Sequence, residues 1–165
     1  MDSSFSPRDF RNALGCFATG ITVMTTCDAD GRFVGITVNS FSSVSLDPPL
    51  VAFCLDRNAL SVNSFLNAPH FGVNVLSEEQ EPLSAAFARS SAGDKFIGLE
   101  YEVGTTGCPL LPDCLTHLEC VREAAHLAGD HLIVVGRVIR LAQRAEGRPL
   151  LYFRGRYAKL GGLPG

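Results

Sequence analysis

The chain has 165 residues, which is the size of one domain. Its 14 basic and 17 acidic residues give a net charge of −3 and form no basic run, so a nucleic-acid-binding module is excluded. Hydrophobic residues make up 46% of the chain, which excludes a disordered protein, and the apolar runs are too short to cross a bilayer. We expect a cytoplasmic protein, since the charged first ten residues do not resemble a signal peptide.

Six cysteines are spread along the chain without a CxxC pair. A chain of this length needs no disulfide staples, so we expect reduced thiols in a reducing compartment. The group Cys108, Cys114, His117 and Cys120 has a spacing that matches no standard zinc pattern. The sequence therefore predicts no metal site.

A helix is predicted at the start of the chain. Ser6 suits the N-cap, Pro7 the first helical position and Asp9 the third, where its negative charge is favourable. Apolar residues then recur at helical spacing and predict one buried stripe: Phe10, Leu14 and Phe17. Gly20 is expected to end this helix.

The next segments predict strands. Ile21–Cys27 and Phe33–Phe41 are rich in β-branched residues and flank the turn Asp28–Gly31, so a hairpin is expected. Ser42–Pro49 is polar and ends in two prolines, which predicts a loop. Leu50–Leu55 is apolar without alternation and is expected to be buried on both faces.

The middle of the chain alternates between helix and strand signals. Ala59–Asn67 predicts a short helix and Phe71–Leu76 a strand. Ser77 with Gln80 three residues later predicts a capping box that opens another helix. Residues 92–112 are expected to be loop-like, with at most a short strand near Tyr101–Val103.

The last third of the chain is rich in β signals. Thr116–Leu127 and His131–Leu141 predict two long strands joined by a tight turn at Ala128–Asp130, and Leu150–Phe153 predicts a final strand. Because strands mostly follow strands, the sheet should be antiparallel, and closure would remove its edges. We therefore expect a single domain over residues 1–165 that is mainly β (α+β), a barrel with a few short helices.

Two segments carry possible binding chemistry. Gly35–Pro49 places serines at a chain bend, where hydroxyl and backbone donors suit a ring with several acceptors, although a serine-rich turn can also satisfy its own backbone. Arg57–Ser64 follows a strand and is either a phosphate cradle or an ordinary capped helix. Asp130 and His131 do not predict a hydrolase triad, because neighbouring strand residues point to opposite faces.

Five segments, in order, resemble the short-chain flavin reductase family, the reductase components of two-component flavin-dependent monooxygenases. They are Phe10–Val23, Thr37–Leu50, Phe71–Ser77 with Gln80, Gly129–His131, and Pro149–Gly155 with Tyr157. The resemblance implies an antiparallel split β-barrel of Greek-key type that binds FMN or FAD, usually as a homodimer. The chain differs from many members of this family at Arg57-Asn58-Ala59, where they carry a lysine or a denser serine pair.

The resemblance also implies a distribution of ligand contacts. The isoalloxazine ring would be lined by Thr37, Val38, Asn39, Ser40, Ser42 and Ser43. The ribityl chain and phosphate would lie near Cys54, Leu55, Arg57, Ser61 and Ser64. The phosphate side would be closed by Asn74, Val75, Leu76, Ser77, Phe87 and Arg89. The nicotinamide side would be formed by His131 with Tyr152, Phe153, Arg154 and Gly155.

The function implied is hydride transfer from NADH or NADPH to FMN or FAD, with the reduced flavin supplied to a separate monooxygenase component. Because hydride transfer needs no general base, His131 is expected to orient the nicotinamide. FMN and FAD both stay open, and NADH is favoured over NADPH because no arginine is assigned to a 2′-phosphate. Two other functions stay open: a flavin-dependent oxidase of the pyridoxine-phosphate type, and a non-enzymatic flavin- or haem-binding module.

Overall fold

The computed structural model describes residues 4–89 and 95–161. Its helices are α1 (Pro7–Leu14), α2 (Val62–Asn67) and α3 (Glu81–Ala88). Its strands are β1 (Thr19–Gly20), β2 (Thr22–Cys27), β3 (Phe33–Val38), β4 (Ser42–Leu46), β5 (Pro49–Asp56), β6 (His70–Val75), β7 (Glu102–Val103), β8 (Pro109–Leu110), β9 (Thr116–Ala128), β10 (His131–Gln143), β11 (Leu151–Phe153) and β12 (Arg156–Ala158). None of the helices in these ranges is long and apolar enough to cross a membrane.

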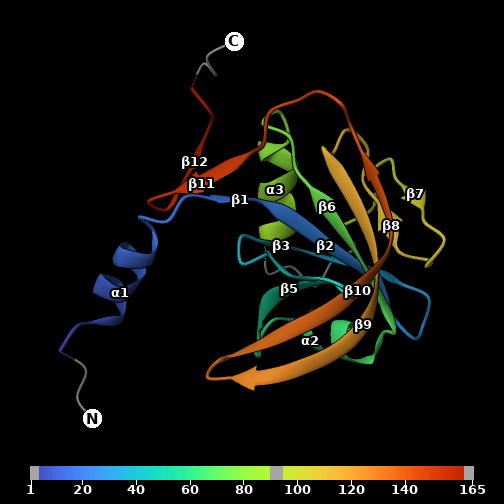
Figure 1. The fold of residues 1–165 in the computed structure, drawn as a ribbon, viewed down its shortest axis with the longest axis horizontal. Coiled ribbons are helices and arrows are strands. Elements are labelled where there is room, and N and C mark those ends of the chain that lie inside the picture. The colour runs from blue at the N-terminus through green and yellow to red at the C-terminus, as the bar shows by residue number, and fades with distance from the viewer. Residues whose placement is uncertain (1–3, 90–94, 162–165) are drawn as a thin grey trace.

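Seven strands form one antiparallel sheet in the order β3-β2-β6-β9-β10-β5-β4 (Figure 1). The strands β3 and β4 lie at the two ends of this order, yet only residues 39–41 separate them in the chain. Since four extended residue steps span at most about 14 Å, the sheet must curl until its two edges meet. The fold is therefore the expected antiparallel split barrel, and its seam lies beside residues 39–41.

Two clusters of buried side chains hold the fold together. One fills the barrel around Phe53 and Phe71, whose rings meet edge to face at 5.3 Å, and Phe65 of α2 packs against Phe53. The other lies outside the barrel, where Phe87 of α3 packs against Phe96 with ring centroids 5.2 Å apart. Figure 1 shows α3 on one side of β3 and α2 on the other, so the two helices flank one edge of the sheet.

The start of α1 is as predicted, but its end and its packing are not. The Ser6 hydroxyl accepts a hydrogen bond from the Asp9 amide, and the Asp9 carboxylate accepts one from the Ser6 amide. The helix ends at Leu14, well before Gly20, because Gly20 is extended in β1 and pairs with Leu151 of β11.

The prediction that α1 has a buried apolar stripe is wrong for a single chain. Phe10, Leu14 and Phe17 are 52%, 59% and 77% exposed, and α1 buries no residue. Figure 1 shows this helix standing apart from the barrel, joined to it through β1.

Three further expectations for the first half of the chain need correction. Ser42–Pro49 is not a loop: Ser42 and Ser43 begin β4, because their backbone pairs with Ala52 and Val51 of β5. The strand β5 alternates, with buried residues on the barrel side and half-buried residues on the outer side. Ser77 and Gln80 form only half a capping box. The Gln80 side chain accepts a bond from the Ser77 amide, but α3 begins after Gln80 and has no side-chain cap.

The second half follows the prediction more closely. The long pair β9 and β10 turns at Gly129, whose φ of 65° is one that glycine adopts readily. Within the expected loop, residues 92–94 lie outside the described residues. The short strand expected near Tyr101–Val103 is β7, and it pairs with β8, a strand that the sequence did not indicate. The final strand β11 is followed by β12, which was not predicted, through a two-residue turn at Arg154 and Gly155, both with positive φ.

Glu119 anchors the loop before β8 and gives a testable pH dependence. Its carboxylate is nearly buried and accepts hydrogen bonds from the hydroxyls of Thr105 and Thr106 and from the Thr106 amide. Burial raises the pKa of Glu119, but these hydrogen bonds and Arg140 together lower it below the ordinary value. A carboxyl group with a lowered pKa in the folded state stabilises the fold above its unfolded pKa, and this contribution is lost as pH falls.

We therefore expect Glu119→Gln to lower the free energy of unfolding at pH 7 by about 1.5–3 kcal/mol, the range for hydrogen bonds to a charged group. The difference between variant and wild type should begin to shrink as pH falls through the ordinary carboxyl pKa of about 4.3, and it should be lost at the lower pH where the folded-state carboxylate is protonated. Urea denaturation at pH 7 and at that lower pH measures this. Equal differences at the two pH values would contradict the role of the ionised carboxylate.

Candidate functional site

The seam of the barrel brings together segments that are far apart in the sequence. The Ser40 hydroxyl accepts a hydrogen bond from the Cys54 amide at 2.9 Å and donates to the Cys54 carbonyl at 3.1 Å. This pair of bonds fixes residues 39–41 against β5. Asn39, Ser42 and Ser43 are exposed on either side of Ser40. Their side chains and backbone donors therefore form a polar surface at the seam that a planar ring with acceptor atoms can contact.

His131 lies beside the C-terminal end of β5, on the neighbouring strand β10. It is the first residue of β10 and pairs with Asp56, one position before Arg57. Its Nδ1 is 2.7 Å from the Asp130 carboxylate, and this hydrogen bond and the charge of His131 lower the pKa of Asp130. The hydrogen bond holds the ring orientation and leaves Nε2 available. His131 is half-exposed, so a ligand at the seam can reach it.

Arg57 is held to the same turn from the other side. Its amide donates to the Asp130 carbonyl at 3.0 Å, and its guanidinium lies 3.5 Å from the Gly129 carbonyl. The side chain is exposed. The backbone of Arg57 therefore fixes the end of β5 against the β9–β10 turn. Leu55 of the same strand is buried and contributes to the barrel core.

A groove lies along the free edge of β3, over residues 31–36. It has a volume of about 720 Å³ and is bounded by the start of α2 on one wall and by the end of α3 on the other. Four residues that the resemblance assigns to the flavin line it: Ser61, Ser64, Phe87 and Arg89. The Ser61 hydroxyl makes no capping bond to α2 and so can face the groove.

Lys95 is a lining residue of this groove that the sequence reasoning missed. Its ammonium group donates to the Phe87 carbonyl at 2.8 Å and lies 3.4 Å from the Gly35 carbonyl. Burial lowers the pKa of Lys95. The chain holds only two lysines, and this one follows the small and polar residues Ser90–Asp94, so its spacing alone carried no signal. With Arg32 and Arg89 it gives the groove three cationic groups in addition to the serine hydroxyls.

Several predicted site residues have structural partners instead. The Thr37 hydroxyl donates to the Ser84 carbonyl at 2.7 Å, and Val38 packs in the barrel core. The buried Asn74 amide group donates to the Val23 carbonyl at 3.0 Å and accepts from the Leu111 amide at 2.8 Å. These side chains position strands, and a contact from them to a ligand stays a prediction.

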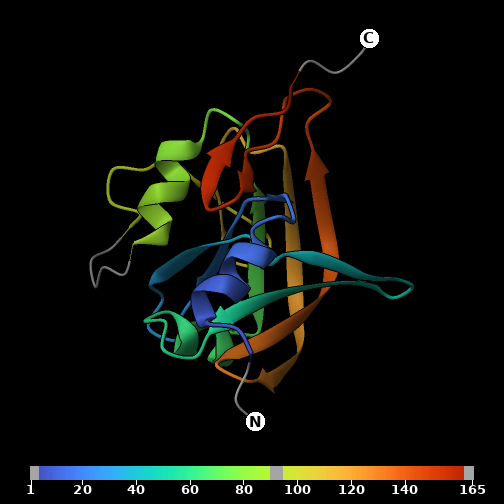
Figure 2. The ribbon, with the colours of Figure 1, turned by 90° about the vertical axis from the view of Figure 1, so that its left-hand side faces the viewer.

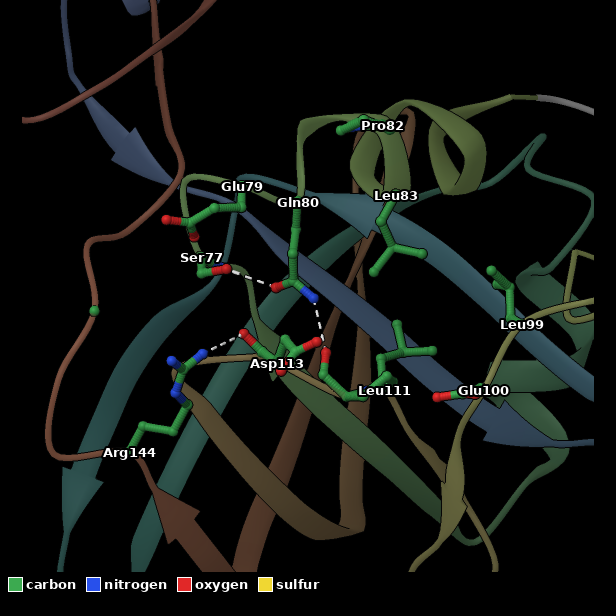
Figure 3. Close-up of a pocket in the computed structure, with 12 residues that line it drawn as sticks. Ser77, Glu79, Gln80, Pro82, Leu83, Leu99, Glu100, Leu111, Asp113 and Arg144 are labelled. Carbon is green, nitrogen blue, oxygen red and sulfur yellow. Dashed lines mark hydrogen bonds between the residues drawn. The ribbon is translucent and has the colours of Figure 1, made fainter.

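The segment that follows Asn74 faces a second cavity. Leu76 and Ser77 are buried, Val75 is half-buried, and Ser77 lines a hollow of about 510 Å³ (Figure 3). There, Gln80 bridges the Ser77 amide and the Pro112 carbonyl, and Arg144 donates to the Asp113 carbonyl. The structure does not bring Val75, Leu76 and Ser77 to the groove along β3, so their assignment to the phosphate side also stays a prediction.

The segment assigned to the nicotinamide lies away from His131. Tyr152–Gly155 forms the β11–β12 turn, which is bound to the end of α1 by a 2.8 Å hydrogen bond from the Arg154 amide to the Gly15 carbonyl. Figures 1 and 2 both show this turn well separated from the β9–β10 turn, which lies at the bottom of each view. One chain alone therefore does not join the two halves of the predicted nicotinamide site.

The candidate zinc ligands serve other roles. His117 Nε2 is 2.7 Å from the Leu111 carbonyl oxygen, and burial raises the pKa of the Cys114 and Cys120 thiols to about 12. Over residues 4–89 and 95–161, no three histidine, cysteine or acidic side chains are grouped as metal ligands.

Comparison with known proteins gives a consistent result. Residues 14–161 match the family described as flavin reductase like domain. The chain is 47% identical over 152 residues to an FMN reductase (NADH) of Agrobacterium fabrum, an alignment that spans 92% of this chain and 85% of that protein. It is 43% identical to the reductase subunit of a flavin-dependent monooxygenase of Rhodococcus jostii, over 93% of this chain and 78% of the other.

A solved structure shares the fold. The NADH:FAD oxidoreductase of Streptomyces globisporus, solved with NAD and FAD fragments, superposes with a TM-score of 0.89 at 34% identity. The match covers 96% of this chain and 97% of that one.

Proposed function

Since the chain belongs to the flavin reductase like family, we propose that it is an NAD(P)H:flavin oxidoreductase that supplies reduced flavin to a separate monooxygenase component. The overall reaction converts NAD(P)H, oxidised flavin and a proton into NAD(P)⁺ and reduced flavin, with hydride passing from nicotinamide C4 to flavin N5. The observation that carries the proposal is the polar seam around Ser40, together with a groove along β3 that holds serine hydroxyls and three cationic residues.

The residues of the chain have separate tasks in this proposal. The exposed donors of Asn39, Ser42 and Ser43 contact the ring edge on which negative charge grows during reduction, and this stabilises the charge without an ionised side chain. Ser61 and Ser64 hold the phosphate end. His131, oriented by Asp130, contacts the nicotinamide and holds it at the ring.

Flavin acts as a substrate that enters and leaves. The lining of the seam consists of neutral hydroxyls and backbone groups, and such a site binds less tightly than a clamp of several arginines. The monooxygenase partner is supported by the Rhodococcus relative, which is itself a reductase subunit of such an enzyme. We place the protein in the cytoplasm because all six cysteines are free thiols, as in a reducing compartment.

The proposal includes a homodimer. The apolar side chains of Phe10 and Leu14 in α1 and of Phe17 just after it are more than half exposed in one chain, and a group of exposed apolar side chains marks an interaction surface. The Arg154–Gly15 hydrogen bond fixes the β11–β12 turn to this helix. When α1 docks on a second copy it carries residues 152–155 with it, and these complete the nicotinamide site that begins at His131 of that copy.

The test is anaerobic mixing of the purified protein with FMN or FAD and then with NADH or NADPH. We expect loss of the flavin absorbance and equimolar oxidation of the nucleotide. An oxidase of the pyridoxine-phosphate type would reduce flavin with its own substrate instead. A binding module would perturb the flavin spectrum without turnover. Absence of any spectral change on adding either flavin would refute the proposal.

His131→Ala is expected to slow flavin reduction by NADH about 10–100-fold, because the nicotinamide loses an orienting contact worth roughly 1.4–2.8 kcal/mol in the transition state. The flavin dissociation constant should change by less than about twofold. Stopped-flow reduction and fluorescence titration measure the two quantities. Asp130→Asn is the matched control, since it keeps the imidazole and weakens only its orientation. A loss of flavin affinity equal to the loss of rate would mean that His131 contacts flavin.

A further inference from the structure

The strand β12 is the outer strand of the small sheet β1-β11-β12, and a pair of hydroxyl groups joins it to α3. In the described part of the chain, β12 pairs only with β11. The phenol oxygen of Tyr157 in β12 lies 3.0 Å from the hydroxyl oxygen of Ser84 in α3, so one hydroxyl donates a hydrogen bond to the other. Figure 2 shows β11 and β12 beside α3. This hydrogen bond therefore ties the strand that follows the β11–β12 turn to a helix of the main body.

Ser84 connects this hydroxyl pair to the strand that leads into the seam. Ser84 is fully buried, and its carbonyl accepts a hydrogen bond from the Thr37 hydroxyl at 2.7 Å. Thr37 lies in β3, two residues before Asn39, whose side chain contacts the flavin ring in the proposed function. Ser84 is therefore bonded to β12 through its side chain and to β3 through its backbone, so it sets the position of one strand relative to the other.

Tyr157 extends this restraint to the turn that is assigned to the nicotinamide. It pairs with Tyr152 across the β11–β12 ladder, and the two rings meet edge to face with centroids 5.8 Å apart. Both rings are half-buried against the apolar cluster that contains Phe87. Apolar packing has no preferred direction, whereas a hydrogen bond does, so the Tyr157 hydroxyl fixes where its ring lies in that cluster. Tyr152 is thereby held at a defined place relative to Ser84.

We infer that Ser84 and Tyr157 are positioning residues for the reduction of flavin by NADH, an inference that rests on the proposed function. Their hydroxyl pair holds the β11–β12 turn in the arrangement in which residues 152–155 receive the nicotinamide. If the turn spends part of its time in another arrangement, NADH binds more weakly in proportion to that fraction. Once bound, NADH selects the correct arrangement and transfers hydride at the ordinary rate. The pair therefore governs the affinity for NADH and leaves the rate of the bound complex unchanged.

The experiment is stopped-flow reduction of saturating flavin at increasing NADH concentration with Tyr157→Phe, which keeps the ring and removes the hydroxyl. We expect the apparent dissociation constant for NADH to rise about threefold to tenfold, the effect of one lost hydrogen bond. The maximal rate and the flavin dissociation constant should each change by less than about twofold. Ser84→Ala should have the same effect, because its carbonyl still accepts the Thr37 bond. The double variant should bind NADH no more weakly than either single variant.

A control and a second measurement separate positioning from stability. Tyr101→Phe is the matched control, since it removes a hydroxyl from a ring that packs on Phe33 and Phe96, and it should change neither dissociation constant. Hydrogen exchange of the peptide covering residues 150–158 reports on the turn directly. Without NADH this peptide should exchange faster in Tyr157→Phe than in the wild type, and saturating NADH should make the two equal.

The outcomes distinguish this inference from the proposed function. If the wild type reduces no flavin, the proposed function fails and the inference fails with it. If the wild type is active and both variants melt at a lower temperature but bind NADH as the wild type does, the hydroxyl pair only stabilises the fold and the inference alone is wrong. If the variants lose as much affinity for flavin as for NADH, the pair acts on β3 and not on the turn, which also overturns the inference.

Discussion

Replacing Phe10 and Leu14 together with aspartate should convert the protein into a monomer with little NADH-dependent flavin reduction. Both side chains lie on the apolar face of α1 and are more than half exposed in one chain. Burying each against a second copy contributes roughly 1.5–3 kcal/mol. The double variant should therefore raise the dimer dissociation constant about 100-fold to 10,000-fold. Sedimentation velocity over a range of protein concentrations measures this constant.

The loss of activity has a specific cause in this case. The β11–β12 turn is fixed to α1 by the Arg154–Gly15 bond, so a monomer lacks residues 152–155 beside His131. Activity per mole of the double variant should rise with protein concentration as the dimer reforms by mass action. Asn12→Asp, which adds a charge on the other side of α1, is the control and should stay dimeric. A fully active monomer would show that one chain forms a complete nicotinamide site.

Gly136→Ala should be the most destabilising small substitution in the barrel. Gly136 lies in β10 opposite Val51, and an added Cβ would sit 2.3 Å from Cζ of Phe71 and 3.2 Å from Cβ of Cys120. Phe71 cannot move away because it is buried against Phe53. Overpacking of this kind costs about 1–3 kcal/mol, which lowers the melting temperature by about 3–10 °C in a chain of this size.

A second substitution tests the cause. In the Gly136→Ala background, Phe71→Leu should lower the free energy of unfolding by less than it does in the wild type, because the shorter side chain leaves the space that the new methyl group needs. Gly20→Ala is the matched control, since no atom lies within 4 Å of its added Cβ, and it should change stability by less than about 0.5 kcal/mol. Thermal unfolding of the four variants gives the coupling. Additive effects of the two substitutions would rule out a clash between residues 136 and 71.

The sequence predicted the elements that are stabilised by contacts between residues close together in the chain. The capping box of α1 was predicted because Ser6 and Asp9 satisfy each other within one turn. The long pair β9 and β10 was predicted because a glycine turn joins two continuous β-branched runs. The strand β4 was missed because its serines have no intrinsic strand preference, and only pairing with β5, which follows it, makes them extended.

The residues of the candidate site also divide into those that the sequence indicated and those that depend on contacts distant in the chain. The serines at the seam stood out by their composition, and the order of five segments connected them with a family. Lys95 did not stand out, because its place in the groove depends on contacts with the carbonyls of Phe87 and Gly35, which come from α3 and β3. The burial of Asn74 was also hidden, since its amide partners lie 51 and 37 residues away in the chain.

The short connection between β3 and β4 has a consequence for engineering. Residues 39–41 join the two margins of the curled sheet, and Asn39 with the neighbouring Ser42 and Ser43 presents the polar surface offered to the ring. Substitutions in residues 39–43 will trade folding stability against affinity, because this short segment both closes the sheet and contacts the ring. Libraries that aim to change cofactor choice should therefore vary lining residues of the groove along β3, such as Arg32 and Leu60, whose side chains are exposed and hold no strand in place.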